Sequence, residues 1–192
     1  MNTKFLTAVG LAAGLMGFVT AAQAVPIAAG SALSLNGNDT YTATATSFTI
    51  NFSNPADVGA ATGSFTALAP LPATGAATMI STLSNTTAAG FTLYTATVGA
   101  VTTDLVAASI TGFSFVSGAL PTLTVTGAGT LDLTGFTPTP GLFTITTQGP
   151  TGAAVTFSAT SVATAVPEPA SLTLLGSALV GLGWLGRRRK TV

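Results

Sequence analysis

Four aspartates are the only acidic side chains between residues 25 and 166. They are Asp39, Asp57, Asp104 and Asp132. A pair of carboxylates is the minimum that glycoside hydrolysis requires, with one group acting as the acid and the other as nucleophile or base. Asp39 and Asp57, however, lie in the turn-forming sequences "NGND" and "NPAD", and Asp132 lies between two leucines of an expected strand. We therefore interpret these aspartates as turn and surface residues rather than as a catalytic pair.

The other side chains that enzymes commonly use are missing from this segment. The chain has no histidine and no cysteine, and its single glutamate, Glu168, lies near the C-terminus. Residues 25–166 also contain no lysine and no arginine. A Ser-His-Asp triad, a Cys-His pair, a zinc site, a lysine nucleophile and a basic patch for nucleic acid are therefore excluded here. We expect neither an enzymatic activity nor a cofactor.

Calcium needs only oxygen ligands, which this segment does contain. "NGND" offers Asn36, Asn38 and Asp39, and "NPAD" offers Asn54 and Asp57. Neither sequence has the spacing of an EF-hand loop. Because Asn and Asp tolerate the left-handed backbone of tight turns, we favour Asx-rich turns over a calcium site.

Two further patterns are compatible with ligand binding. Tyr41 and Tyr94 could form an aromatic platform for carbohydrate, or could be amphipathic residues at a sheet edge. Threonine also repeats at every second position, as Thr42, Thr44 and Thr46 and as Thr122, Thr124 and Thr126. Such rows resemble flat ice-binding surfaces, although a solvated β face is the commoner reason for them.

The elements that must carry these residues are predicted to be strands. Apolar residues alternate with polar ones in "FTINF", "FTLYTATV", "TLTVTG", "LFTITT" and "AVTFSATSV". Turn-forming sequences such as "NGND", "NPAD", "TAAG", "GALP" and "QGPTG" separate the runs. The pattern predicts one all-β domain, an antiparallel sandwich or barrel-like sheet of about eight or nine short strands. The core candidates are Phe48, Phe52, Phe65, Phe91, Phe113, Phe115, Phe143 and Phe157.

Two local expectations refine this arrangement. In "YTATATSFTINF" the threonines of the first half and the apolar residues of the second half are all at even-numbered positions, so one regular strand would place them on the same face. We therefore expect a bulge near Thr46 or Ser47, or a strand that leaves the core at its start. The sequences "LTVTG" and "LDLTG" are expected to be two arms of a hairpin around residues 127–129.

The first 24 residues have the three parts of a signal peptide. Lys4 supplies the positive charge, and "FLTAVGLAAGLMGFV" supplies the apolar stretch. "TAAQA" then ends with Ala22 and Ala24 in the small-x-small arrangement that signal peptidase recognises. We predict cleavage after Ala24 and export of the rest of the chain.

The remaining positive charge is collected at the C-terminus. Residues 170–186 are uncharged and would span about 25 Å as a helix, at the short end of what crosses a bilayer. The basic cluster that follows consists of Arg187, Arg188, Arg189 and Lys190. We predict a transmembrane helix over residues 170–186 and a stop-transfer role for the cluster, which the positive-inside rule keeps in the cytoplasm.

Before this helix stands the tripeptide Pro167-Glu168-Pro169. Tripeptide, short apolar helix and basic cluster together resemble the PEP-CTERM sorting tail of Gram-negative bacteria, a tail also labelled ice-binding protein C-terminal domain. The resemblance covers residues 166–190. It implies recognition by an exosortase, a membrane transpeptidase, and delivery to the cell surface or the exopolysaccharide matrix.

The sequence thus predicts a signal peptide (1–24), a Thr/Gly-rich β domain (25–166) and a sorting tail (167–190). We expect an exported cell-surface or biofilm-matrix protein with a structural or interaction role, tethered transiently to the inner membrane. Signal peptidase, exosortase and exopolysaccharide are its expected partners. The alternative is a module that binds polysaccharide, Ca²⁺ or ice.

Overall fold

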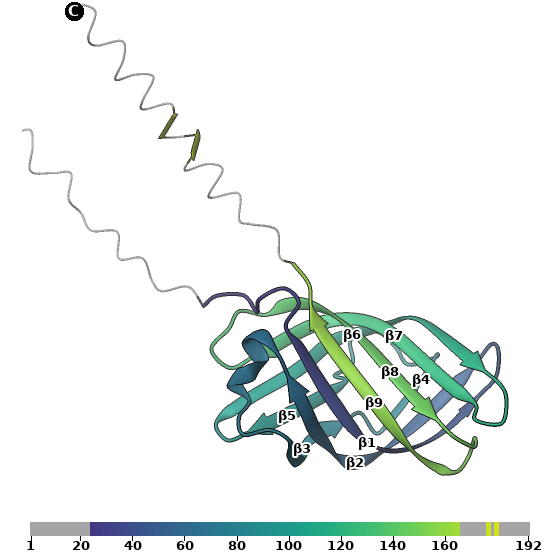
Figure 1. Ribbon diagram of the computed structural model, residues 1–192. Helices are drawn as coiled ribbons and strands as arrows, with labels where there is room; N and C mark the ends of the chain where they lie inside the picture. The colour runs from purple at the N-terminus through teal and green to yellow at the C-terminus, as the bar shows by residue number, and fades with distance from the viewer. Residues whose placement is uncertain (1–23, 166–175, 178, 181–192) are drawn as a thin grey trace, which may run out of the picture.

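The computed structural model describes residues 24–165 and, further on, residues 176–177 and 179–180. Residues 24–165 form an all-β fold with one short 3₁₀ helix, as predicted (Figure 1). The elements in chain order are β1 (Ala32–Ala43), β2 (Phe48–Ala61), η1 (Gly63–Ala67), β3 (Ala73–Met79), β4 (Thr82–Ser84), β5 (Tyr94–Val98), β6 (Val101–Val116), β7 (Thr122–Leu133), β8 (Thr139–Gln148) and β9 (Ala154–Ala163).

Eight of these strands form a closed antiparallel barrel. Neighbouring strands are hydrogen-bonded in the order β1-β9-β8-β7-β6-β5-β3-β2, and β2 pairs with β1 to close the ring. The remaining strand, β4, pairs with β2 beyond the end of β3. Of the two architectures that the sequence leaves open, the structure therefore shows the barrel and not the sandwich.

Inward-facing side chains fill the barrel. Along β8, every second residue from Thr139 to Thr147 is buried, as strand alternation requires. Aromatic contacts join strands across the interior, with centroids 4.9 Å apart in both the tilted Phe48–Phe113 pair and the edge-to-face Phe52–Phe157 pair. All the predicted core phenylalanines contribute: Phe48, Phe52, Phe65, Phe143 and Phe157 are buried, and Phe91, Phe113 and Phe115 are partly buried against them.

Glycines on the inner face make room for the largest side chains. Gly127 lies opposite Phe143, and Gly37 lies opposite Phe157. A Cβ at Gly37 would lie 2.8 Å from the Phe157 ring, and a Cβ at Gly127 would overlap the Phe143 ring and the Ser109 carbonyl oxygen. Small and large residues therefore alternate across the barrel, which allows eight strands to close around a filled interior.

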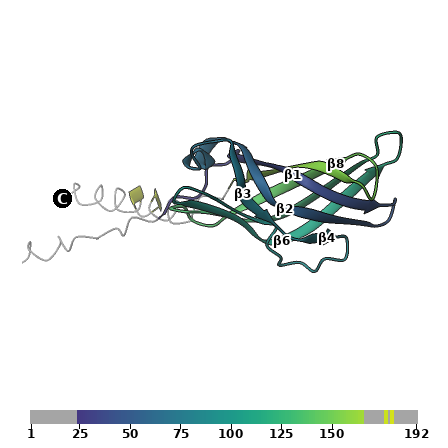
Figure 2. The same cartoon turned by 90° about the horizontal axis from the view of Figure 1, so that it is seen from below.

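The two ends of the barrel differ. At one end the first and last described segments meet, where the Gly30 N–H donates to the Ala163 carbonyl (2.9 Å) (Figure 1). Phe65 and Leu68, in and just after η1, are fully buried there. The opposite end, which we call the rim, carries the turns between β1 and β2, β6 and β7, and β8 and β9 (Figures 1 and 2).

Several local expectations were wrong. "NGND" lies within β1 and not at a turn, because its pairing with β9 overrides the turn preference of Asn, Gly and Asp. "NPAD" lies within β2, at an irregularity of the β1–β2 pairing where residues 54–56 have no partner in β1. "LTVTG" and the first three residues of "LDLTG" belong to the single strand β7 and not to a hairpin. The two halves of "YTATATSFTINF" lie on different strands joined by a turn at residues 44–47, so their shared parity needs no bulge.

The helix expected for the signal peptide lies outside the described residues. The predicted transmembrane helix also lies outside them, apart from Gly176, Ser177, Leu179 and Val180, which are helical. Within the part of the chain that the structure describes, no helix has the length and apolarity that crossing a membrane requires.

Candidate functional site

Asp39, which we expected at a turn, lies inside the barrel. The residue is fully buried, and its Oδ1 accepts a hydrogen bond from Thr147 Oγ1 (3.0 Å) in β8. Its Oδ2 has no hydrogen-bond donor among the described residues. Burial raises the pKa of the Asp39 carboxyl to about 6, and the hydrogen bond from Thr147 opposes this shift. The sequence does contain a signal for this inward position. Asp39 lies an even number of residues after the buried Leu33 and Leu35, and side chains at such spacing point to the same face of a strand.

Tyr41, two residues further along the same face, holds two rim turns together. Its hydroxyl lies 2.8 Å from the Pro121 carbonyl oxygen and 2.7 Å from that of Gly149, and it donates its one proton between them. Burial, and after it the nearby Asp39 carboxylate, raise the pKa of Tyr41, so the hydroxyl stays a donor at neutral pH. Tyr41 is thus a structural bridge.

Tyr94 occupies a second polar position in the interior. Burial raises its pKa, and the Ser161 and Thr103 hydroxyls nearby lower it. The Tyr94 hydroxyl nevertheless meets hydrogen-bond geometry with no described residue. Neither tyrosine is exposed, so the expectation of an aromatic platform or a sheet-edge residue was wrong for both.

The two sequences considered as calcium sites do not bring their side-chain oxygen atoms together. Asn36 and Asn38 are exposed on the outside of β1, whereas Asp39 faces the interior. The Asn54 side chain pairs with the backbone of Met79 at 2.7 and 2.9 Å, and thereby joins β2 to β3. No group of three or more metal-ligating acidic side chains occurs within the described residues.

Asp57 also has a structural partner. Its Oδ1 accepts a hydrogen bond of 2.7 Å from the Gly75 N–H, across the pairing of β2 with β3. This carboxylate therefore stabilises the start of β3, and it is not placed beside another acidic side chain for catalysis.

Asp104 and Asp132 are the two carboxylates that the fold does bring together. They lie directly opposite each other on β6 and β7, both half-buried on the outer face of the barrel. Thr102, Thr134 and neighbouring residues complete a shallow depression of about 340 Å³ around them. Because residues 24–165 contain no cationic side chain, nothing within the described barrel neutralises this pair.

Like charges directly opposite each other destabilise a sheet, so Asp132→Asn is expected to raise the free energy of unfolding by about 0.5 kcal/mol at low ionic strength. The gain should shrink in 1 M salt, where charges are screened over about 3 Å. Urea denaturation at both ionic strengths measures it. Asp57→Asn is the control, because it also removes one negative charge but weakens the hydrogen bond from Gly75. Equal effects of the two substitutions would contradict the prediction.

A neutral surface of hydroxyl and amide groups covers the part of the outside of β7, β8, β9 and β1 that is nearer the rim, and it ends at the apolar row Ala128–Leu142–Val162–Ala32. The predicted threonines of β7 begin it, and strand pairing extends each one into a row of partners. We call this surface the hydroxyl face. Its rows are Thr122–Gln148–Thr156–Asn38, Thr124–Thr146–Ser158–Asn36 and Thr126–Thr144–Thr160–Ser34, none of them buried.

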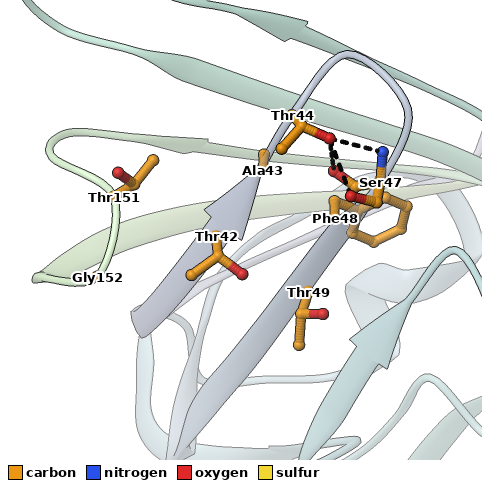
Figure 3. Close-up of a pocket in the computed structure, with 8 residues that line it drawn as sticks. All are labelled: Thr42, Ala43, Thr44, Ser47, Phe48, Thr49, Thr151 and Gly152. Atoms are coloured by element: carbon orange, nitrogen blue, oxygen red, sulfur yellow. Dashed lines mark hydrogen bonds between the residues drawn. The ribbon is translucent and has the colours of Figure 1, made fainter.

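The other expected threonine row does not form. Thr42 is on the outside of β1, but Thr44 and Thr46 lie in the following turn, where Thr44 Oγ1 accepts from the Ser47 N–H at 3.1 Å. A shallow depression of about 210 Å³ at the rim lies between this turn and Thr151 (Figure 3). Its polar side chains are hydroxyls alone, so it offers hydrogen bonds but no acid or base.

The residues predicted to direct sorting and processing lie almost wholly outside the described part of the chain. Ala24 is described and exposed. The others are Ala22, Pro167, Glu168, Pro169, Arg187, Arg188, Arg189 and Lys190. Signal-peptide cleavage and the stop-transfer role therefore stay predictions.

Comparison with protein families identifies the tail. Residues 165–190 match the family model described as the PEP-CTERM protein-sorting motif, which includes the Pro-Glu-Pro tripeptide, the apolar stretch and the basic cluster. Neither the curated proteins nor the solved structures gave a match. The motif implies export, processing by an exosortase and sorting to the cell surface. The chain is therefore a PEP-CTERM sorting domain-containing protein.

Proposed function

We propose that the barrel is a non-enzymatic structural or interaction component of the cell surface or the extracellular matrix, and that its hydroxyl face contacts exopolysaccharide. The observation that carries the proposal is this face, three rows of exposed or half-buried hydroxyl and amide side chains over four adjacent strands. Polysaccharides present hydroxyls at a comparable density, so donors and acceptors can be matched on both sides, directly or through water.

The charge of the barrel is consistent with a neutral contact. The hydroxyl face itself carries no charged side chain, and Asp39 beneath it is buried. Asp104 and Asp132 lie at the opposite end of β6 and β7 from the threonines of β7 that begin the face. A neutral or weakly acidic polymer can therefore approach the face without strong repulsion.

Removing hydroxyls from the face tests the proposal. Thr124→Val combined with Thr146→Val keeps side-chain shape and strand propensity but deletes two neighbouring donors. At about 1 kcal/mol for each of the two hydrogen bonds, we expect roughly a thirtyfold loss of affinity for exopolysaccharide purified from the producing organism. Calorimetric titration of the full chain in neutral detergent measures the affinity.

The matched control is Thr92→Val combined with Thr95→Val, two exposed threonines outside the face. It should bind as the unmodified protein does. Equal affinity of both variants, or no binding by the unmodified protein, would count against the proposal. Titration with Ca²⁺ alone reports separately on Asp104 and Asp132.

A further inference from the structure

One stretch of β6 has a partner on only one of its two edges. β6 pairs with β5 over residues 101–105, and the backbone of Ala108 then bonds to Gly90 and Phe91, each at 2.9 Å. From residue 110 to residue 116, β6 pairs with β7 alone within the described chain. The short strand β4, which continues the line of β3, pairs only with β2. We call residues 110–116 the open edge.

The open edge lacks two of the features that usually prevent edge-to-edge association, and its one register shift, between Ile110 and Gly112, lies at its start and leaves the pairing of residues 112–116 regular. Such edges are commonly interrupted by charged side chains or proline. No charged residue occurs between Asp104 and Asp132, and residues 110–116 contain no proline. Large apolar side chains are exposed instead, since Val116 at the end of the edge is 64% exposed and Leu120 in the turn that follows is 66% exposed.

We propose that the open edge pairs in antiparallel fashion with the open edge of a second copy of this chain, so that the two barrels share one continuous sheet. A two-fold axis makes an edge strand its own complement, because each copy offers the same backbone donors and acceptors in the reversed direction. Val116 and Leu120 of each copy then cover apolar side chains of the other copy instead of facing water.

Charge favours this contact over others between two copies. The barrel has carboxylates and no cation, so a contact that includes Asp57, Asp104 or Asp132 places like charges near each other. Asp104 lies about ten residues before the middle of the open edge, roughly 30 Å at the rise of a strand. Antiparallel pairing places the two copies of Asp104 at opposite ends of the joint sheet.

The contact is small, which limits its strength. Stable interfaces commonly contain about 20–30 residues on each side, whereas a pairing of seven-residue edges with a few flanking side chains contains about half as many. We therefore expect a dissociation constant in the micromolar range, so that dimers form at the concentrations reached on a crowded surface.

Lysine at one edge position is the primary test. Ser114 and Ser158 both lie on the outside of the barrel in the same cross-strand row, but β9, which carries Ser158, is bonded to strands on both sides. Ser114→Lys is expected to weaken dimerisation at least tenfold, and Ser158→Lys should leave it unchanged. Sedimentation velocity of the full chain in neutral detergent over a concentration series measures both, with circular dichroism to check that each variant is folded.

Cysteine cross-linking provides the second measurement, because the chain has no cysteine of its own. Single cysteines at Gly112, Ser114 and Val116 should give covalent dimers with a short bifunctional thiol reagent, with the highest yield at the residue nearest the axis. Thr144→Cys should give none. A monomer at all concentrations, or a dimer that Ser114→Lys leaves intact and that cross-links no better at the open edge than at residue 144, would overturn the proposal.

Discussion

Replacing Asp39 with asparagine is expected to make the barrel more stable by a net amount of about 2 kcal/mol at pH 7 and above, and slightly less stable near pH 4. The expected gain follows from the pKa of the buried carboxyl, about 6 in the folded protein and 3.8 in the unfolded reference. Each unit of pKa difference corresponds to about 1.4 kcal/mol.

The sign of the effect follows from proton binding. Between pH 3.8 and 6 the folded protein keeps a proton on Asp39 that the unfolded chain has released, so folding is progressively disfavoured as the pH rises through this range. Above pH 6 the folded protein holds a buried carboxylate whose Oδ2 has no donor among the described residues, and the loss is complete. Asparagine keeps an oxygen that accepts the hydrogen bond from Thr147, and its side chain does not ionise in this pH range.

Urea denaturation from pH 4 to pH 8, followed by far-UV circular dichroism, measures the difference between the two proteins. The asparagine side chain leaves its own N–H₂ group without an evident acceptor, which subtracts about 1 kcal/mol at every pH. A stability difference that does not change with pH would show that Asp39 does not titrate in this range and would refute the prediction.

Gly127→Ala is expected to lower the free energy of unfolding by about 3 kcal/mol, the upper end of what overpacking costs in a core. The added Cβ overlaps the Phe143 ring on one side and the Ser109 carbonyl oxygen on the other. Phe143 is buried and cannot turn away without displacing its neighbours, and the carbonyl belongs to the backbone of β6. Strain must therefore spread into both strands.

Two companion variants make this prediction specific. Gly112→Ala, across the pairing with Thr126, would bring its Cβ no closer than 3.5 Å to the Thr126 hydroxyl, so its effect should stay within about 0.5 kcal/mol. Adding Phe143→Leu to Gly127→Ala should recover part of the loss, because the shorter side chain vacates the space. Urea denaturation of the three variants and the unmodified protein measures these differences. If Gly112→Ala cost as much as Gly127→Ala, backbone propensity and not packing would be the cause.

The alternation of side chains was enough to predict the class of fold but not its closure. "LFTITT" and "AVTFSATSV" correctly indicate half-buried strands at β8 and β9. Sandwich and barrel share this alternation, because both have one inner and one outer face. What distinguishes them is the pairing of β1 with β9, which joins the first strand to the last and leaves no local signal.

The interior position of Asp39 was not predicted, because the turn preference of "NGND" outweighed the alternation of inward and outward side chains along a strand. "NGND" contains the residues of a tight turn, yet β1 continues through it with a change of register between Asn36 and Asn38. The contact of Asp39 with Thr147 joins residues 108 positions apart, which no local pattern predicts. The sorting tail, by contrast, was readable because its tripeptide, apolar stretch and basic cluster are contiguous in the chain.

The pairing of the first strand with the last has a consequence for the order of events during export. Ala32 of β1 pairs with Val162 of β9, so the ring cannot close until nearly all of the barrel sequence has crossed the membrane. The match to the sorting motif begins at residue 165, directly after β9 ends at Ala163. The last strand and the sorting signal are therefore delivered together. Four residues can span at most about 14 Å, so we expect an exosortase that recognises the tripeptide beginning at Pro167 to approach the closed barrel within that distance of Ala163.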